Sequence, residues 1–163
     1  METYERSVRV GAPLAEVWDF HSRIDGLEAL TPPWLHLRVE AIRGPEAEQE
    51  FDPVADELVP GTKIRLSMQP GGVGPRIRWT SHITDRAVED GSAYFVDEML
   101  DGPFRTWKHA HLFYADGDET VARDRLRYEF PFGALGRAVG PLGVLGLEPM
   151  FRHRHQRTRE LLE

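Results

Sequence analysis

Two histidines separated by one residue are the groups in this chain best suited to chemistry. His109 and His111 lie in the stretch TWKHAHLFY, residues 106–114. Residues two apart in a β-strand point to the same side, so both imidazoles share a face with Trp107 and Phe113. An imidazole can move protons near neutral pH, bind a metal ion or form hydrogen bonds. The aromatic neighbours predict that this face points inward.

The next strand supplies a carboxylate to the same face. A tight turn at Gly117-Asp118 pairs the two strands so that His111 lies opposite Asp124 and Trp107 lies opposite Tyr128. A register shifted by one residue would turn three arginines inward, which is energetically costly. We therefore expect His111 and Asp124 to be cross-strand neighbours on the inner face.

Three functions are open to the group His109, His111 and Asp124. A histidine–carboxylate pair can hold one tautomer for acid/base chemistry, such as cyclisation or dehydration of a carbonyl compound. Two histidines and a carboxylate can also bind a metal ion, although a His-x-His pair is common by chance. Alternatively, the histidines are neutral, hydrogen-bonded groups that orient a ligand in an apolar cavity. We favour this third interpretation and expect no metal and no cofactor.

The other residues expected around such a cavity come from the inner faces of alternating strands. On the strand at 92–100, either of two faces can point inward, and we favour the one with Phe95 and Asp97. The predicted ligand-binding residues are Ile64, Leu66, Met68, Trp79, Ser81, Phe95, Trp107, His109, His111, Phe113 and Tyr128.

Apolar spacing predicts the elements that would position this face. Residues 2–10 alternate as a first strand, and Pro13 then begins a short helix that includes Leu14 to Phe20. A second short helix is expected at 24–30, ended by Thr31-Pro32-Pro33.

Beyond these helices the period becomes two, which predicts an antiparallel sheet with one buried face. The expected strands are 35–41, 63–68, 77–84, 92–100, 105–114 and 120–130. Their connections are rich in Gly, Pro and Asp, and Pro70–Pro75 reads as a hairpin turn because it lacks a dinucleotide-binding fingerprint.

Helical spacing returns after Gly133, with a kink or an irregular first part expected near Pro141 and Pro149. The chain therefore predicts an α+β domain spanning 1–163. A curved antiparallel sheet would wrap a long C-terminal helix, with two short helices after the first strand.

Composition excludes several classes of protein. The formal net charge of −7 disfavours nucleic acid or an anionic membrane as the main partner. The absence of cysteine excludes disulfides and thiolate chemistry. The N-terminal stretch lacks the apolar region of a secretory signal, and the longest apolar run, 138–147, is too short to span a bilayer. We expect a cytoplasmic protein without an integral membrane segment, and a homodimer stays open.

Two charged stretches are less informative. The acidic segment 46–57 lacks the order of a calcium-binding loop and is expected to be a solvated loop near the cavity mouth. The basic stretch Arg152–Arg157 would fan around a helix, with His153 and Arg157 on one face. An anionic group is one interpretation, but favourable charges near a helix C-terminus explain the stretch equally well.

The order of elements and several sequence segments resemble the START-like superfamily, also called SRPBCC. Its polyketide cyclase/dehydrase and coenzyme-Q-binding branch is the most similar. The matching segments are APLAEVWDF, LTPPWLHLRV, GTKIRLSM, WTSHIT, FVDEMLDGPFRTWKHAHLFY, RDRLRYEFPFG and MFRHRHQRT. The resemblance implies a helix-grip fold with a deep hydrophobic cavity, but it does not imply one reaction.

Three functions follow from these observations. The first is binding or transport of a hydrophobic or aromatic small molecule, such as a lipid, isoprenoid or polyketide-like compound. The second is a cofactor-independent cyclase or dehydratase that uses His109 or His111 with Asp124. The third is a regulatory or partner-binding domain whose cavity is filled by its own side chains.

Overall fold

A curved antiparallel sheet forms the body of the protein. The computed structural model describes residues 1–46 and 57–163, so the loop expected at 46–57 lies almost entirely outside the described residues. The described residues form a seven-stranded sheet in the order β1-β7-β6-β5-β4-β3-β2. The strands are β1 (Glu2–Val10), β2 (Arg38–Arg43), β3 (Lys63–Met68), β4 (Ile77–Glu89), β5 (Ser92–Leu100), β6 (Thr106–Asp116) and β7 (Glu119–Glu129).

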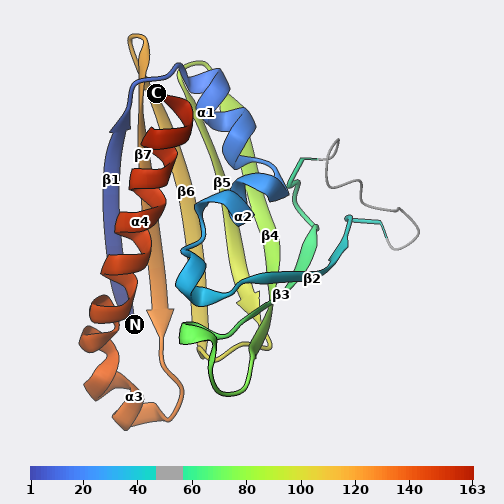
Figure 1. Ribbon diagram of the computed structural model, residues 1–163, viewed down its shortest axis with the longest axis vertical. Coiled ribbons are helices and arrows are strands. Elements are labelled where there is room, and N and C mark those ends of the chain that lie inside the picture. Colours follow the sequence, from blue (N-terminus) through green and yellow to red (C-terminus); the bar gives the residue numbers. More distant parts are fainter. Residues whose placement is uncertain (47–56) are drawn as a thin grey trace.

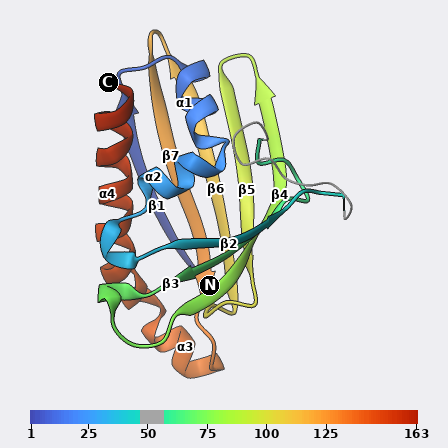
Figure 2. The same ribbon diagram turned by 45° about the vertical axis from the view of Figure 1, so that its right-hand side comes forward.

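Three of the four helices in the described residues lie on one face of this sheet, and the fourth follows the end of the last strand (Figure 1). The four are α1 (Leu14–His21), α2 (Ile24–Leu30), α3 (Gly133–Val139) and α4 (Val144–Leu162). Figure 1 shows α4 running along β1 and β7, with α1 and α2 beside it, and Figure 2 shows the same arrangement turned about the vertical axis. Short 3-10 turns occur at Pro33–Leu35, Pro70–Gly72 and Gly140–Gly143. The predicted helix-grip fold is confirmed.

The predicted pairing of the histidine strand is also confirmed. His111 lies opposite Asp124, and Trp107 lies opposite Tyr128. The favoured inner face of β5 is correct as well, because Phe95 is buried and Asp97 reaches the histidines. Alternation between apolar and charged residues, together with the tight turn, was sufficient to set this register.

The prediction for the strand at 35–41 was wrong in two respects. Its first residues form a 3-10 turn, and His36 has a left-handed φ of 47°, so β2 begins only at Arg38. A register shift between Val39 and Ala41 then reverses the alternation. Consequently Ala41 is exposed and Ile42 packs towards the core. A bulge inserts one extra residue, which a strict two-residue period cannot anticipate.

Helix α4 is fixed to the sheet by both apolar and polar contacts. Phe151 is 1% exposed and its ring centroid lies 5.2 Å from that of Tyr4 on β1. The Tyr4 hydroxyl donates a hydrogen bond to Glu148 on α4 at 2.6 Å. The predicted break in the C-terminal helical region occurs at Gly140–Gly143, which includes Pro141, whereas Pro149 is accommodated within α4.

Two helical glycines should respond in opposite ways to replacement by alanine. A Cβ on Gly26 of α2 would lie 2.1 Å from the carbonyl oxygen of Phe20, whereas a Cβ on Gly146 of α4 meets no atom within 4 Å. We expect Gly26→Ala to lower the free energy of unfolding by about 1–3 kcal/mol, because backbone must move. Gly146→Ala should raise it by up to about 1 kcal/mol through helix propensity. Urea unfolding measures both, and a stabilised Gly26→Ala protein would contradict the described packing.

Candidate functional site

A cavity of about 180 Å³ opens between the inner face of the sheet, α2 and α4. Most of its wall is apolar, with polar side chains supplied by both the sheet and the helices. The lining residues are His21, Leu27, Leu30, Thr31, Pro32, Leu35, Leu37, Leu66, Met68, Trp79, Phe95, Asp97, Met99, Pro103, Phe104, Trp107, His109, His111, Met150, Phe151 and Arg154.

The residues predicted from the sequence fall into two groups in the structure. Those on the cavity wall are Leu66, Met68, Trp79, Phe95, Trp107, His109 and His111. The cavity lining does not include Ile64, Ser81, Phe113, Tyr128 or Asp124.

The second group lies behind the wall or beside it. Ile64 and Phe113 belong to the packed core around Trp18. The hydroxyl of Tyr128 donates to the carbonyl of Gly140 at 2.9 Å, and the hydroxyl of Ser81 donates to Asp97 at 3.3 Å. These residues lie on the inner face of the sheet. One part of that face is packed core, and another part lines the cavity.

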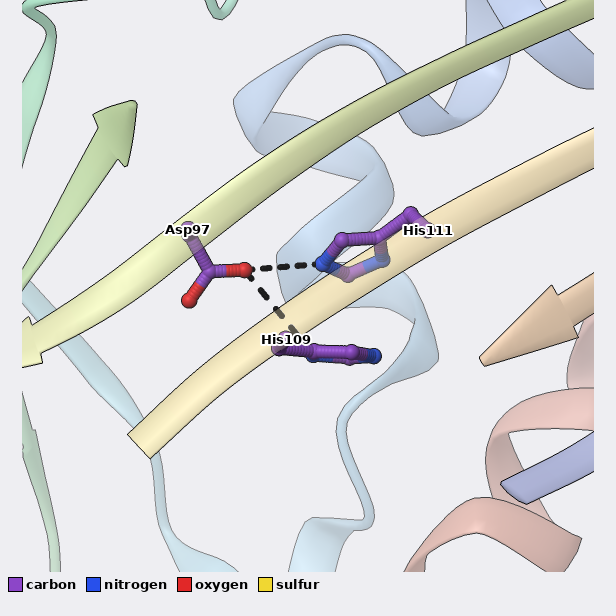
Figure 3. A group of neighbouring side chains, drawn as sticks. All are labelled: Asp97, His109 and His111. Atoms are coloured by element: carbon purple, nitrogen blue, oxygen red, sulfur yellow. Dashed lines mark hydrogen bonds and ion pairs between the residues drawn. The ribbon is translucent and has the colours of Figure 1, made fainter. Parts of the chain in front are cut away.

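His109 and His111 lie side by side on β6, with ring centroids 3.7 Å apart. Each histidine bonds to a carboxylate on a neighbouring strand. His109 Nε2 lies 2.7 Å from Asp124 Oδ1 on β7, and His111 Nε2 lies 2.8 Å from Asp97 Oδ2 on β5. Figure 3 shows Asp97 reaching across towards both imidazoles.

The two hydrogen bonds run diagonally across the strands. Asp124 is the cross-strand neighbour of His111, and Asp97 is the cross-strand neighbour of His109. Each carboxylate nevertheless bonds to the other histidine at the shorter distance. The predicted neighbour relation is therefore correct, whereas the tight hydrogen bond of Asp124 goes to His109.

Helix α4 completes the surroundings of Asp124. His155 Nε2 lies 2.5 Å from Asp124 Oδ2, and Arg154 Nε lies 3.8 Å from Asp124 Oδ1. The side chains of Asp124 and His155 are 7% and 6% exposed. The buried carboxylate thus joins the sheet to the helix.

Arg154 and His155 are the functional candidates that the sequence interpretation missed, because they lie within a stretch of basic residues. A signal was present in the helical spacing. Leu147, Phe151 and His155 follow one another at intervals of four residues, and all three are buried. Arg152, by contrast, points outward and pairs with Glu148. The basic stretch is therefore divided between an inner and an outer face.

The hydrogen bonds of His111 define a neutral tautomer. Arg154 Nη2 donates to Nδ1 of His111 at 3.3 Å, so Nε2 carries the proton that is donated to Asp97. Burial lowers the pKa of His111 to about 4, despite the bond to Asp97. Phe95 stacks on the same imidazole at a centroid distance of 4.0 Å. These contacts fix the position of the ring.

Both carboxylates are ionised in this arrangement. Burial favours the protonated form of Asp124, but the Arg154 guanidinium and the hydrogen bonds from His109 and His155 hold its pKa well below the usual value. Burial is likewise outweighed at Asp97, where the hydrogen bond from His111 and the nearby His109 lower the pKa. The polar end of the cavity therefore presents a carboxylate, two imidazoles and one guanidinium.

A third histidine lines the cavity from α1. His21 Nδ1 donates to the carbonyl of Val17 at 2.7 Å, and its Nε2 faces the Thr158 hydroxyl at 3.5 Å. Burial, followed by the positive charge of Arg154, lowers the pKa of His21 to about 3. This histidine is neutral at physiological pH.

The possible metal ligands differ from the set considered from the sequence. Ligand atoms of Asp97, His109 and His111 lie within 4.8 Å of one another, so Asp97 takes the place that was considered for Asp124. Asp124 instead bonds to the opposite nitrogen of His109.

No helix among residues 1–46 and 57–163 has the length and apolar character needed to cross a membrane.

Comparison with known proteins agrees with this architecture. The family model described as polyketide cyclase/dehydrase and lipid transport matches residues 10–150. The START-like resemblance seen in the sequence is thereby confirmed. Among functionally curated proteins, none matches the chain significantly.

Solved structures show the same fold at low sequence identity. A protein from Thermus thermophilus is 17% identical, with a TM-score of 0.62 over 99% of this chain and 100% of that one. A START superfamily protein from Mycobacterium smegmatis is 15% identical, with a TM-score of 0.61 and 98% of each chain covered. Norcoclaurine synthase from Thalictrum flavum is 16% identical, with a TM-score of 0.65 over 98% of this chain and 85% of that one.

Acidification below pH 6.5 should destabilise the protein through His21. The pKa of His21 is about 3 in the folded protein and about 6.5 in the unfolded chain. Between these values the unfolded state binds more protons, so the stability contributed by neutral His21 is lost as the pH falls. The expected loss from this residue is on the order of 1 kcal/mol per pH unit at most, the effect of one proton bound on unfolding.

Urea unfolding of the wild type and His21→Asn between about pH 5 and about pH 7 measures this contribution. The wild-type curve should have the steeper dependence on pH, because the variant lacks the group that takes up a proton on unfolding. Equal slopes for the two proteins would contradict the assignment.

Proposed function

Since the chain belongs to the polyketide cyclase/dehydrase and lipid transport family, we propose that it binds a small hydrophobic or aromatic molecule in its cavity. The observation that carries this proposal is an apolar cavity of about 180 Å³ with its polar groups gathered at one end. Ligand sites typically combine apolar walls with a few polar groups that set orientation. The ligand therefore combines an apolar body with one polar group.

The size of the cavity supports a ligand with one or two rings. A dry cavity of about 150 Å³ lined by aliphatic and aromatic side chains holds benzene. The slightly larger cavity here suits a compact ring system better than an extended acyl chain. Trp79, Phe95 and Trp107 supply flat surfaces against which such a ring can stack.

The proposed contacts follow the division of the wall. Leu66, Met68 and the aromatic side chains contact the apolar body, and His109 and His111 face its polar group. Asp97 and Arg154 join the histidines at this end. Ile64, Ser81, Phe113 and Tyr128 support the wall from behind.

Filling the cavity should weaken binding of a probe of this type. The chosen probe is 2-naphthol, a two-ring molecule with a single hydroxyl group. Met68 lines the cavity and is only partly buried, so Met68→Trp adds volume without replacing a core residue. We expect the dissociation constant to rise at least ~10-fold, a cost of about 1.4 kcal/mol. Quenching of tryptophan fluorescence or calorimetry measures the binding.

The matched control for this experiment is Leu135→Trp. Leu135 is 66% exposed on α3 and is absent from the cavity lining. The control should bind 2-naphthol as the wild type does. Binding that survives Met68→Trp, or that is lost equally in both variants, would place the probe outside the cavity.

The second candidate function is acid/base catalysis on a bound carbonyl compound. The observation that favours it is the pairing of His109 with Asp124 at 2.7 Å on the cavity wall. A carboxylate held against one ring nitrogen fixes the tautomer and leaves the other nitrogen available for proton transfer. The third alternative, a domain whose cavity is filled by its own side chains, has no comparable support.

Proton abstraction can be tested with 2-tetralone, a two-ring ketone whose α-protons exchange through an enol. If His109 acts as a base, the protein should accelerate deuterium uptake from D₂O, followed by proton NMR. His109→Gln should lower the accelerated rate of deuterium uptake about 10²-fold or more, while 2-tetralone still binds. No acceleration by the wild type, with binding intact, would leave ligand binding as the function. Equal loss of binding and exchange would assign His109 a binding role.

A further inference from the structure

We propose that Asp97, His109 and His111 form a site for one divalent first-row transition-metal ion at the polar end of the cavity. Asp97 Oδ2 lies 2.8 Å from His111 Nε2 and 3.8 Å from His109 Nδ1. All three ligand atoms lie within 4.8 Å of one another. Figure 3 shows the three side chains gathered together on neighbouring strands. Two imidazole nitrogens and one carboxylate suit ions such as Zn²⁺, Fe²⁺ and Co²⁺.

The surroundings of these residues resemble those of metal ligands. A histidine ligand usually donates its second N–H to a carboxylate, which fixes the ring. His109 would bind through Nδ1, and its Nε2 already contacts Asp124 at 2.7 Å. Asp97 would bind through Oδ2, while the Ser81 hydroxyl bonds its Oδ1 at 3.3 Å. Two of the three ligands therefore have their supporting hydrogen bonds in place.

The third ligand requires a change of tautomer. His111 can bind an ion through Nε2 only when its proton is on Nδ1, which now accepts a hydrogen bond from Arg154. Once the proton is on Nδ1, this nitrogen can donate a hydrogen bond to Asp124 Oδ1, which lies 3.5 Å away. Arg154 remains next to Asp124, at 3.8 Å. The net number of protons on His111 does not change.

The charge of the site favours a cation. Asp97, Asp124 and Arg154 are largely buried and together carry one negative charge, before any proton on a histidine is counted. Buried charge is stabilised only when it is paired or coordinates a metal. Arg154 lies beside Asp124. A divalent ion beside Asp97 would therefore supply the missing positive charge.

The geometry also leaves coordination positions open. All three residues line the cavity, so an ion held by them would face the apolar space. Metal sites with three protein ligands and an open position are typical of catalytic rather than structural sites. The proposal concerns the ion alone and does not depend on which small molecule, if any, enters the cavity.

Calorimetric titration of the untagged protein with ZnCl₂ tests the site directly. We expect one ion per chain, and we expect Asp97→Asn to weaken binding at least ~10-fold. The matched control is Glu98→Gln, because Glu98 is the next residue of β5 and pairs with Lys108. The control should bind zinc as the wild type does. Titration with Co²⁺ should give visible absorption bands in the wild type and Glu98→Gln only.

Imidazole NMR of the wild type keeps the test independent of how well Asp97→Asn folds. Stoichiometric Zn²⁺ should shift the ring signals of His109 and His111 and leave those of His36 and His82 unchanged. The proposal is overturned if the wild type shows no saturable binding of one ion. It is equally overturned if binding is undiminished in Asp97→Asn, or if the shifted signals belong to other histidines.

Discussion

The buried carboxylate of Asp124 is the interaction on which the rest of the site depends. It contacts His109 on the neighbouring strand and His155 on α4, with Arg154 close by. An ionised carboxylate in the interior is stable only when such partners surround it, and removing one partner leaves an uncompensated charge. The sheet and the C-terminal helix must therefore remain close together for this carboxylate to stay buried. The same requirement keeps His109 oriented at the end of the cavity.

Packing reinforces this constraint and separates the cavity from the core. Phe151 of α4 packs on Tyr4 and makes an edge-to-face contact with the ring of His109. Helix α4 therefore contacts the histidine strand through apolar as well as polar side chains. Phe95 stacks against the imidazole ring of His111. A group of polar side chains joined by hydrogen bonds thus lies at one end of a mostly apolar space. Such pre-organisation reduces the entropy lost when a ligand is oriented or a proton is transferred.

Much of the fold could be predicted because the chain uses clear local signals. The alternation in β6 and β7 and the turn at Gly117 set the pairing of His111 with Asp124. The same reasoning failed at β2, where His36 and a bulge after Val39 break the period.

At the site, the sequence identified which face of each strand points inward. It did not identify which residues of that face line the cavity and which are packed in the core. Phe113 and Tyr128 share that face, yet they lie in packed core, Phe113 against Trp18 and Tyr128 against Phe104 and Gly140. The diagonal bonds, and the inward turn of Arg154, depend on side-chain directions that strand pairing does not determine.

A crystal structure of the protein with 2-naphthol would show whether the cavity binds a compact aromatic ligand with its polar group at the histidines. We expect the naphthalene ring between the sheet and α4, in contact with Trp79 and Trp107. Its oxygen should lie within hydrogen-bond distance of Asp97, His109, His111 or Arg154, with Asp124 still joined to His109 and His155. A cavity closed by its own side chains, with naphthol absent or bound on the outer surface, would contradict this expectation.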